Sequence, residues 1–429
     1  MKTKIFVLFF IVSVAITSCC NKGEKQVEDA MHHAEWVYNA TIYEVNIRQY
    51  TPEGTFSAFM NHIPRLKELG VDILWFMPVQ PIGEVERKGT LGSYYSIKDY
   101  TRINPEFGTL EQFKQIVDAA HNAGMKVILD WVANHSSHDA VWIAEHKDWY
   151  VTDNLGKVVS PYDWTDVAKL NYDNADMRQA MREAMIFWLK GTDIDGFRCD
   201  VAYEVPTDFW ESTVVELKKI KPDIFMLAEA EKPELNVMAF NAYYGWELHH
   251  VMNDIAQGKA DVNSLRNVLS KTANFPEYAI PMYFTSNHDE NSWKGSEFER
   301  MGDAVPAFAA LTFVLPGMPL IYSGQEVGFN RRLAFFEKDS IDWTDAKNFT
   351  ALYQKLIKLK KDNKALFCPE LGGALEEIKT NKPNEIFAIR RTVENNKIIV
   401  VFNLSPNNVD VTLEGNEQME LLPWEYRIM

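Results

Sequence analysis

The stretch DGFRCDVA, residues 195–202, has the pattern of a short buried strand that carries charge at its end. Phe197 and Val201 are apolar, whereas Arg198 and Asp200 stand two positions apart and therefore face the same side of a strand. Burying an unpaired charge is unfavourable, so two charges on one face need partners or a function.

Short apolar runs and amphipathic helical patterns alternate around this strand along most of the chain. The eight candidate strands are residues 41–47, 71–78, 126–132, 195–201, 223–230, 242–247, 281–287 and 318–324. Helical patterns over residues 55–70, 175–190 and about 207–220 lie between them. Eight such units predict a parallel (β/α)₈ TIM barrel, an α/β fold, over residues 36–364.

Two segments depart from the alternation. Residues 136–173, after the third strand, are long, aromatic and irregular, and a loop of this length is usually functional. They predict a short inserted domain, domain B. Residues 365–429 contain short apolar runs separated by Asn, Pro and Gly turns, which predicts a C-terminal antiparallel β-sandwich.

The composition limits the possible partners. The chain is 46% apolar and 24% charged, as in globular proteins. Its net charge of −16 and the lack of a Lys/Arg-rich run argue against nucleic acid as a partner. Only Cys199 and Cys368 fall in the part expected to fold, which excludes a disulfide framework.

The N-terminus predicts a processing signal. Lys2 and Lys4 precede an apolar run, residues 5–16, that is too short to span a bilayer. It leads into Ile16-Thr17-Ser18-Cys19, which resembles the lipobox of bacterial lipoproteins. This resemblance implies a signal peptide over 1–18, a lipid anchor at Cys19, a tether over 19–35 and a location in the cell envelope, at the outer membrane or the periplasmic face. An ordinary secretory signal is the alternative.

Ionisable side chains follow several of the predicted strands. The fourth strand ends in Arg198 and Asp200, the fifth in Glu229 and the seventh in His288 and Asp289. Because active sites of such barrels lie at the carboxyl ends of the strands, these groups are expected to meet on one rim.

Three carboxylates on one rim suit the cleavage of a glycosidic bond, which needs one carboxylate and one carboxylic acid. In a retaining enzyme the two are roughly 5 Å apart. The acid needs a raised pKa, whereas Arg198 is expected to keep Asp200 ionised. The sequence has no Ser/His/Asp order, phosphate-binding glycine loop or HExxH motif that would favour another chemistry.

Four motifs, DWVANH (130–135), GFRCD (196–200), AEAE (228–231) and FTSNHD (284–289), resemble the sequence regions of the α-amylase family, glycoside hydrolase family 13, in order and spacing. The resemblance covers about residues 36–429. It implies that Asp200 is the nucleophile that forms a glycosyl-enzyme, that Glu229 is the general acid/base, and that Asp289 is the third carboxylate.

The resemblance also implies further site residues. Arg198 would orient Asp200, and Asp130 would be a structural residue or a partner of Arg198. His135 and His288 would bind sugar hydroxyls. Tyr95 would be the aromatic platform of the cleavage subsite.

The sequence leaves open whether the protein binds calcium. Members of this family often bind Ca²⁺ through the asparagine that Asn134 matches and a histidine shortly after the nucleophile. Here Tyr203 and Glu204 stand where a Lys-His pair is common, which also weakens assignment as a strict α-amylase. Glu204 still offers oxygen to this hard cation. No organic cofactor is implied.

The favoured function is hydrolysis of α-1,4-glucosidic bonds in starch or maltodextrin. An α-glucanotransferase, or an α-glucosidase or maltodextrinase, would use the same site. A non-catalytic glucan-binding lipoprotein is the alternative from another class, since a fold alone does not prove activity. The intact set of three carboxylates argues against it.

Overall fold

The computed structural model describes residues 33–429. The predicted signal peptide, Cys19 and most of the predicted tether lie outside the described residues. Within them the packed chain begins at His33, which is buried and hydrogen-bonds through Nε2 to the carbonyl oxygen of Tyr278.

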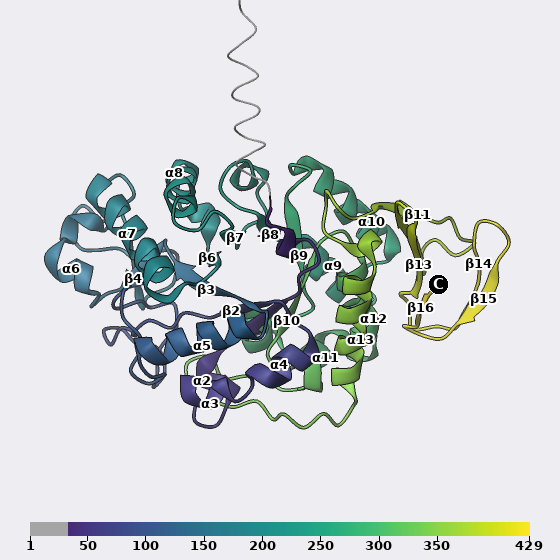
Figure 1. Ribbon diagram of the computed structural model, residues 1–429, viewed down its shortest axis with the longest axis horizontal. Helices are drawn as coiled ribbons and strands as arrows, with labels where there is room; N and C mark the ends of the chain where they lie inside the picture. The colour runs from purple at the N-terminus through teal and green to yellow at the C-terminus, as the bar shows by residue number, and fades with distance from the viewer. Residues whose placement is uncertain (1–32) are drawn as a thin grey trace, which may run out of the picture.

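Eight parallel strands close into a barrel at the centre of the molecule (Figure 1). They are β1 (Ile42–Val45), β2 (Ile73–Phe76), β3 (Lys126–Val132), β6 (Gly196–Asp200), β7 (Phe225–Ala228), β8 (Ala242–Tyr244), β9 (Ile280–Tyr283) and β10 (Met318–Tyr322). They follow one another around the barrel in chain order, and β10 pairs with β1. Each overlaps one of the eight predicted strands, so the prediction of a (β/α)₈ barrel is confirmed.

Strand β6 shows how charged side chains enter the barrel. Phe197 and Cys199 on β6 belong to the large apolar cluster under the helices. Because successive side chains of a strand point to opposite faces, Arg198 and Asp200 point inward. The interior below them is filled by apolar side chains such as Ile128, Leu227 and Met282.

Helices cover the outside of the barrel. They are α2 (Ile47–Tyr50), α3 (Phe56–Met60), α4 (Ile63–Leu69), α5 (Leu110–Asn122), α7 (Ala175–Thr192), α8 (Thr207–Lys218), α9 (Trp246–Ala256), α10 (Val262–Lys271), α11 (Glu297–Met301), α12 (Val305–Val314) and α13 (Phe349–Asp362). The helix expected over 55–70 is two helices, because the chain turns at residues 61–62 and restarts with a proline in the first turn of α4. A capping box formed by Thr109 and Gln112 precedes α5.

The insertion after β3 has little regular structure. Its strands β4 (His135–Ser137) and β5 (Val167–Lys169) pair antiparallel, with the short helix α6 (Val141–Glu145) between them. It lies against the carboxyl end of the barrel, where Ser96 of the loop after β2 donates a hydrogen bond to the carbonyl oxygen of Asp166.

The chain ends in two antiparallel sheets at one end of the molecule (Figure 1). One contains β11 (Ala374–Glu377), β12 (Ile386–Val393), β13 (Asn396–Asn403) and β16 (Tyr426–Ile428), and the other β14 (Val409–Thr412) and β15 (Gln418–Leu421). Ile386 and Val401 of the first sheet pack against Val411 and Leu421 of the second. This agrees with the predicted antiparallel sandwich.

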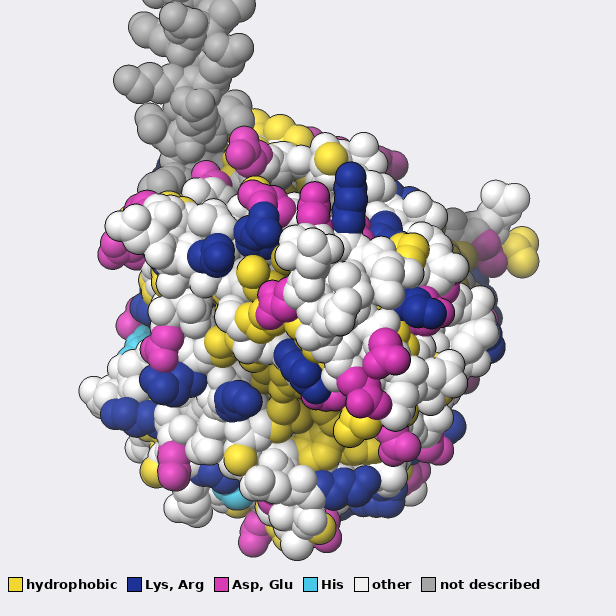
Figure 2. Space-filling model, turned by 90° about the vertical axis from the view of Figure 1, so that its right-hand side faces the viewer, with side chains coloured by type: hydrophobic (Ala, Val, Ile, Leu, Met, Phe, Trp, Pro, Cys, Tyr) yellow, Lys and Arg dark blue, Asp and Glu magenta, His cyan; other side chains and the backbone are white. Residues whose placement is uncertain are grey.

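The surface carries charge of both signs. Figure 2, viewed from the side of the C-terminal strands, shows scattered acidic and basic side chains around a hollow in which hydrophobic side chains gather. Within residues 33–429, no helix has the length and apolarity needed to cross a bilayer.

Candidate active site

A cavity of about 940 Å³ lies at the carboxyl ends of the barrel strands. This volume suits a small-molecule or oligomeric ligand. Six of the predicted site residues line it: Tyr95, His135, Asp200, Glu229, His288 and Asp289. Arg198 is fully buried beneath it. Segments far apart in the sequence therefore meet at one site, as the positions of these residues at strand ends predicted.

Arg198 holds the two predicted catalytic carboxylates side by side. Its Nη1 lies 3.1 Å from Oδ1 of Asp200 and 2.9 Å from Oδ1 of Asp130, and its Nη2 lies 2.9 Å from Oε2 of Glu229. Its Nε donates to the hydroxyl of Tyr244 at 3.0 Å. Asp130 is thus a partner of Arg198, which was one of the two roles expected for it.

The structure corrects one electrostatic expectation. Burial and the neighbouring charge of Glu229 raise the pKa of Asp200 well above its ordinary value, although Arg198 acts in the opposite direction. Burial also raises the pKa of Glu229. The reason is that one guanidinium is divided among three buried carboxyls. Because Asp200 and Glu229 are buried beside each other, ionisation of one disfavours ionisation of the other, so the two compete for protons.

The contacts distinguish the oxygens of these two carboxyls. Oε2 of Glu229 accepts the backbone N–H of Val201 at 2.8 Å and pairs with Arg198. The other oxygen, Oε1, is then the one that can carry a proton. Oδ1 of Asp200 contacts Arg198, whereas Oδ2 lies 3.9 Å from Nε2 of His135. One oxygen of each carboxyl is anchored and the other is available to a substrate.

A second series of hydrogen-bonded side chains begins at β1. Glu44 is fully buried, and its Oε1 lies 2.5 Å from Nδ1 of His288. Nε2 of His288 lies 2.7 Å from the hydroxyl of Tyr95 and 3.3 Å from Oδ2 of Asp289. The Tyr95 hydroxyl donates to Oδ2 of Asp130 at 3.0 Å, which joins this chain to the partners of Arg198.

The two predicted substrate-binding histidines differ in charge. Burial lowers the pKa of His288, but the negative charges of Asp289 and Glu44 outweigh burial and raise this pKa to about 9. Burial lowers the pKa of His135 to about 3. At neutral pH His288 is therefore a cation that donates from both ring nitrogens, whereas His135 is neutral.

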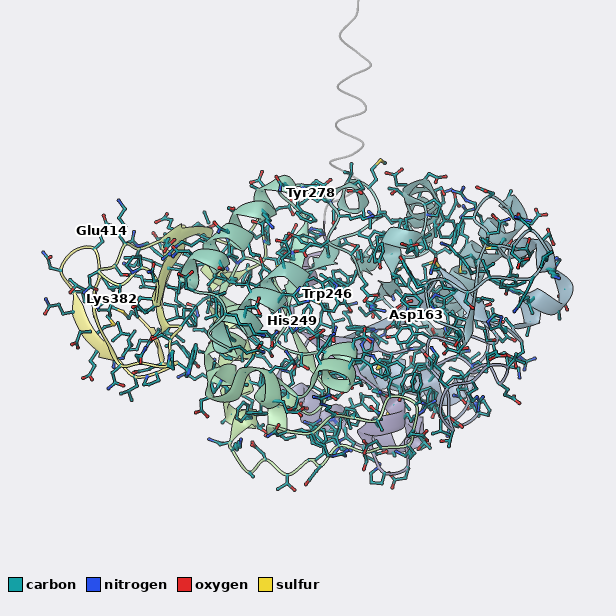
Figure 3. All side chains as sticks on the ribbon, turned by 180° about the vertical axis from the view of Figure 1, so that it is seen from behind. Asp163, Trp246, His249, Tyr278, Lys382 and Glu414 are labelled. Carbon is teal, nitrogen blue, oxygen red and sulfur yellow. The ribbon has the colours of Figure 1, made fainter. Side chains whose placement is uncertain are left out.

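Sequence reasoning missed Glu44 and the aromatic wall of the cavity. A glutamate inside the otherwise apolar strand TIYEVNI (41–47) was the signal that could have revealed Glu44. The wall residues are Trp164, Trp246, Trp293, Phe335 and Phe336. Trp164 lies in the insertion already noted as aromatic, and Trp246 begins α9 near the middle of the molecule (Figure 3).

Asn134 and Glu204, the residues considered for calcium, have partners within the protein. Asn134 is buried, and its Nδ2 lies 3.3 Å from Nδ1 of His135. Glu204 accepts the hydroxyl of Tyr162 and lies 3.5 Å from the ammonium group of Lys169. Among residues 33–429 no group of three or more His, Cys, Asp or Glu side chains could hold a metal ion.

Comparison with known proteins agrees with the geometry. The catalytic-domain model of alpha-amylase matches residues 29–367. An α-amylase of Haloarcula japonica is 27% identical over 91% of this chain, and the chain spans 59% of the length of that protein. A maltogenic α-amylase of Bacillus acidopullulyticus is 28% identical over 84% of this chain and 64% of its own length.

Solved structures are similar over nearly the whole fold. The crystal structure of an α-amylase from Lactobacillus plantarum is 30% identical, with a TM-score of 0.82, and covers 92% of this chain and 99% of its own. A maltogenic α-amylase from Thermotoga neapolitana, 27% identical, also has a TM-score of 0.82, covering 91% of this chain and 96% of its own.

Proposed function

Because the chain belongs to the α-amylase family, the catalytic domain of which matches residues 29–367, we propose that it is a retaining glycoside hydrolase of α-1,4-linked glucans such as starch and maltodextrin. The observation that carries this proposal is the bridge that Arg198 makes between Asp200 and Glu229 on the floor of the cavity. A non-catalytic glucan-binding protein would not need two buried carboxyls of raised pKa beside each other.

The first half of the reaction forms a glycosyl-enzyme. Oδ2 of Asp200 attacks the anomeric carbon while Oε1 of Glu229 donates its proton to the glycosidic oxygen. The bond between that oxygen and the anomeric carbon breaks, and the leaving glucan departs with a new hydroxyl group. A covalent ester links the sugar to Asp200.

The second half restores the site. Glu229, now ionised, removes a proton from water, the water oxygen attacks the anomeric carbon, and the ester bond to Asp200 breaks. Two displacements return the sugar in its original α configuration. The competition of the two carboxyls for protons suits this sequence, because the proton that Glu229 gives up in the first step returns to it in the second.

The remaining residues bind the sugar whose bond is broken. The ring of Tyr95 stacks on His288 with 5.4 Å between centroids and provides a flat surface for that sugar. The cationic His288, the neutral His135 and the carboxylate of Asp289 are placed to hydrogen-bond its hydroxyls. The contact of the Asp289 carboxylate strengthens as positive charge develops on the ring in the transition state.

Product analysis tests the proposal. The purified protein is incubated with a panel of α-glucans, and the products are resolved by chain length and anomeric form. We expect α-configured maltooligosaccharides, and a loss of several orders of magnitude in turnover for Asp200→Asn with glucan binding largely retained. Turnover by Asp200→Asn near the parent rate would refute the site assignment.

Transfer to a sugar would use the same intermediate, because water and a second glucan compete for the ester on Asp200. Incubation of maltoheptaose with and without added maltose separates the two outcomes. Products longer than the substrate that appear only with the acceptor would identify an α-glucanotransferase.

We further propose that the protein is a lipoprotein held at the cell envelope through Cys19. The motif Ile16-Thr17-Ser18-Cys19 after a short apolar run supports this proposal. Expression in bacteria with radiolabelled palmitate is expected to label the parent and not Cys19→Ser. Equal labelling of both would refute the anchor.

A further inference from the structure

The direction in which a glucan lies in the active-site cavity follows from the chemistry of the proposed reaction. The leaving chain is attached at C1 of the sugar that binds Asp200, and it passes Glu229, which protonates it. The rest of the donor chain is attached at O4, at the opposite end of the same ring. In the closed barrel β7, which carries Glu229 at its end, lies across from β1, and β1 lies between β10 and β2. The donor chain therefore points toward the loops after β10 and β2.

These two loops are joined to each other. The backbone N–H of Leu91, after β2, donates to the carbonyl oxygen of Phe336, after β10, at 3.0 Å. The backbone N–H of Thr90 donates to Oε1 of Glu337 at 3.0 Å. The buried side chain of Arg48 donates hydrogen bonds to carbonyl oxygens of both loops. The loops are therefore held together by their backbones and form one continuous barrier.

Aromatic rings thicken this barrier on the side of β9. The ring of Phe335 lies nearly parallel to that of Tyr95, with 6.3 Å between centroids and 12° between planes. Trp293, four residues after Asp289, has its ring 5.1 Å from that of Phe335 and 5.6 Å from that of Phe336. Its indole N–H donates to Oδ1 of Asp289 at 3.2 Å. The barrier thus begins one ring beyond the platform that Tyr95 offers to the donor sugar.

The inserted segment closes the barrier on its other side. Nζ of Lys88, in the loop after β2, lies 2.9 Å from Oδ1 of Asp166, and both residues line the cavity. The side chain of Asp166 is only 7% exposed, so the loss of its partner would leave a nearly buried charge unpaired. Ser96 of the same loop donates to the carbonyl oxygen of Asp166 at 2.9 Å. We call the residues of this barrier that line the cavity the donor wall; they are Lys88, Asp166, Trp293, Phe335 and Phe336.

We propose that the donor wall makes the protein an exo-acting enzyme, which removes one or two glucose units at a time from the non-reducing ends of α-1,4-glucans. This inference rests on the proposed hydrolase function. Cleavage inside a long chain requires the donor chain to continue through the wall. The last sugar of a chain needs no such passage, because its 4-hydroxyl is free. The substrates that fit are therefore maltooligosaccharides and accessible chain ends of starch, whereas closed rings of glucose offer no end.

The test compares two forms of 4-nitrophenyl α-maltoheptaoside. One has a free non-reducing end, and the other carries a 4,6-O-ethylidene group that blocks the 4-hydroxyl of its last sugar. The nitrophenyl group marks the reducing end, so the early products show from which end units are removed. We expect the free form to lose glucose or maltose stepwise, and kcat/KM on the blocked form to be about a hundredfold lower.

Two variants test whether the donor wall causes this difference. Lys88→Ala removes the ion pair with Asp166, and Phe336→Ala removes a ring but keeps the backbone hydrogen bond to Leu91. Each is expected to raise kcat/KM on the blocked form about tenfold, because the clash with the blocked end is relieved, and to release internal fragments from it. Lys88→Arg keeps the positive charge and is expected to behave as the parent.

Lys364→Ala is the matched control, because it also loses an ion pair, with Glu394, but lies outside the cavity. It is expected to leave the ratio between the two substrates unchanged. A parent protein that cleaved both forms alike, or released internal fragments from the free form first, would overturn the exo-acting proposal. So would a blocked form that stayed equally resistant to Lys88→Ala and Phe336→Ala. If the parent cleaved neither form, the proposed function itself would fail, which is a different result.

Discussion

Replacing Glu44 by Gln is expected to change the charge state of His288 without removing any residue that lines the cavity. The carboxylate of Glu44 lies 2.5 Å from Nδ1 of His288 and, together with Asp289, raises the pKa of this histidine from 6.5 to about 9 in spite of its burial. A difference of this size corresponds to about 3 kcal/mol in favour of the charged ring. The amide of Gln keeps the size and can still accept a hydrogen bond, but it carries no charge.

The expected change in the pKa of His288 depends on the groups that still surround this side chain in the variant. In Glu44→Gln, Asp289 still faces His288 but is more than a third exposed, whereas burial and the positive charge of Arg198 continue to lower the pKa. We expect the pKa of His288 to fall to roughly 7. At pH 8 the protonated fraction would then decrease from about 90% to about 10%.

Two measurements follow this change. Spectra of the protein labelled with ¹³C at the histidine Cε1 positions, with the His288 signal assigned by His288→Gln, report its titration directly. Since His288 is proposed to bind sugar hydroxyls as a cation, kcat/KM on maltoheptaose is expected to decline at lower pH in the variant than in the parent. Glu297→Gln is the matched control, because Glu297 is also buried but hydrogen-bonds to Thr285 and Gln325 instead.

The raised pKa of His288 also makes the free energy of unfolding depend on pH. A histidine whose pKa is raised on folding stabilises the protein fully below pH 6.5, and this contribution is lost as the pH rises through about 9. The free energy of unfolding of Glu44→Gln is therefore expected to depend less on pH in this window. If His288 titrated at the same pH in parent and variant, the reasoning about Glu44 would be refuted.

Three further predictions concern other parts of the molecule. Glu229→Gln is expected to lower kcat on maltoheptaose at least a thousandfold but to spare formation of the glycosyl-enzyme from α-maltosyl fluoride, which needs no proton; equal losses in both would contradict the role of general acid. Because Lys169 stands beside Glu204, treatment with EDTA is expected to leave Tm and activity unchanged, and a loss restored by added Ca²⁺ would show that this is wrong. Thr109→Ala removes the cap of α5 and is expected to cost about 1 kcal/mol in urea denaturation, whereas an unchanged midpoint would mean that the cap contributes nothing.

The sequence predicted the barrel well because strand and helix patterns are local. Each of the eight apolar runs overlaps a barrel strand. The helix over 55–70 was less well predicted, since its apolar spacing continues across a turn that only the proline after Ile63 reveals. The spacing of apolar residues shows which face of a helix is buried. A turn that interrupts the helix changes this spacing little.

The part of the site that lies at the ends of barrel strands was predicted from the sequence. Positions at the carboxyl ends of β6, β7 and β9 predicted that Asp200, Glu229 and Asp289 would meet, because the barrel brings these ends together. The competition of carboxyls for Arg198 was missed, since the number of partners around one guanidinium depends on the packing of several strands. Glu44 was missed although its place inside the strand TIYEVNI (41–47) is a signal in the sequence.

Trapping the covalent intermediate tests the central claim most directly. The protein is treated with a 5-fluoro-α-glucosyl fluoride, which slows release of the sugar from the enzyme, and is then digested and analysed by mass spectrometry. We expect one added fluoroglucosyl group, carried by the peptide that contains Asp200 and absent from Asp200→Asn. A protein that hydrolyses maltodextrin but carries the group on another residue, or gives products of inverted configuration with no adduct, would contradict the account.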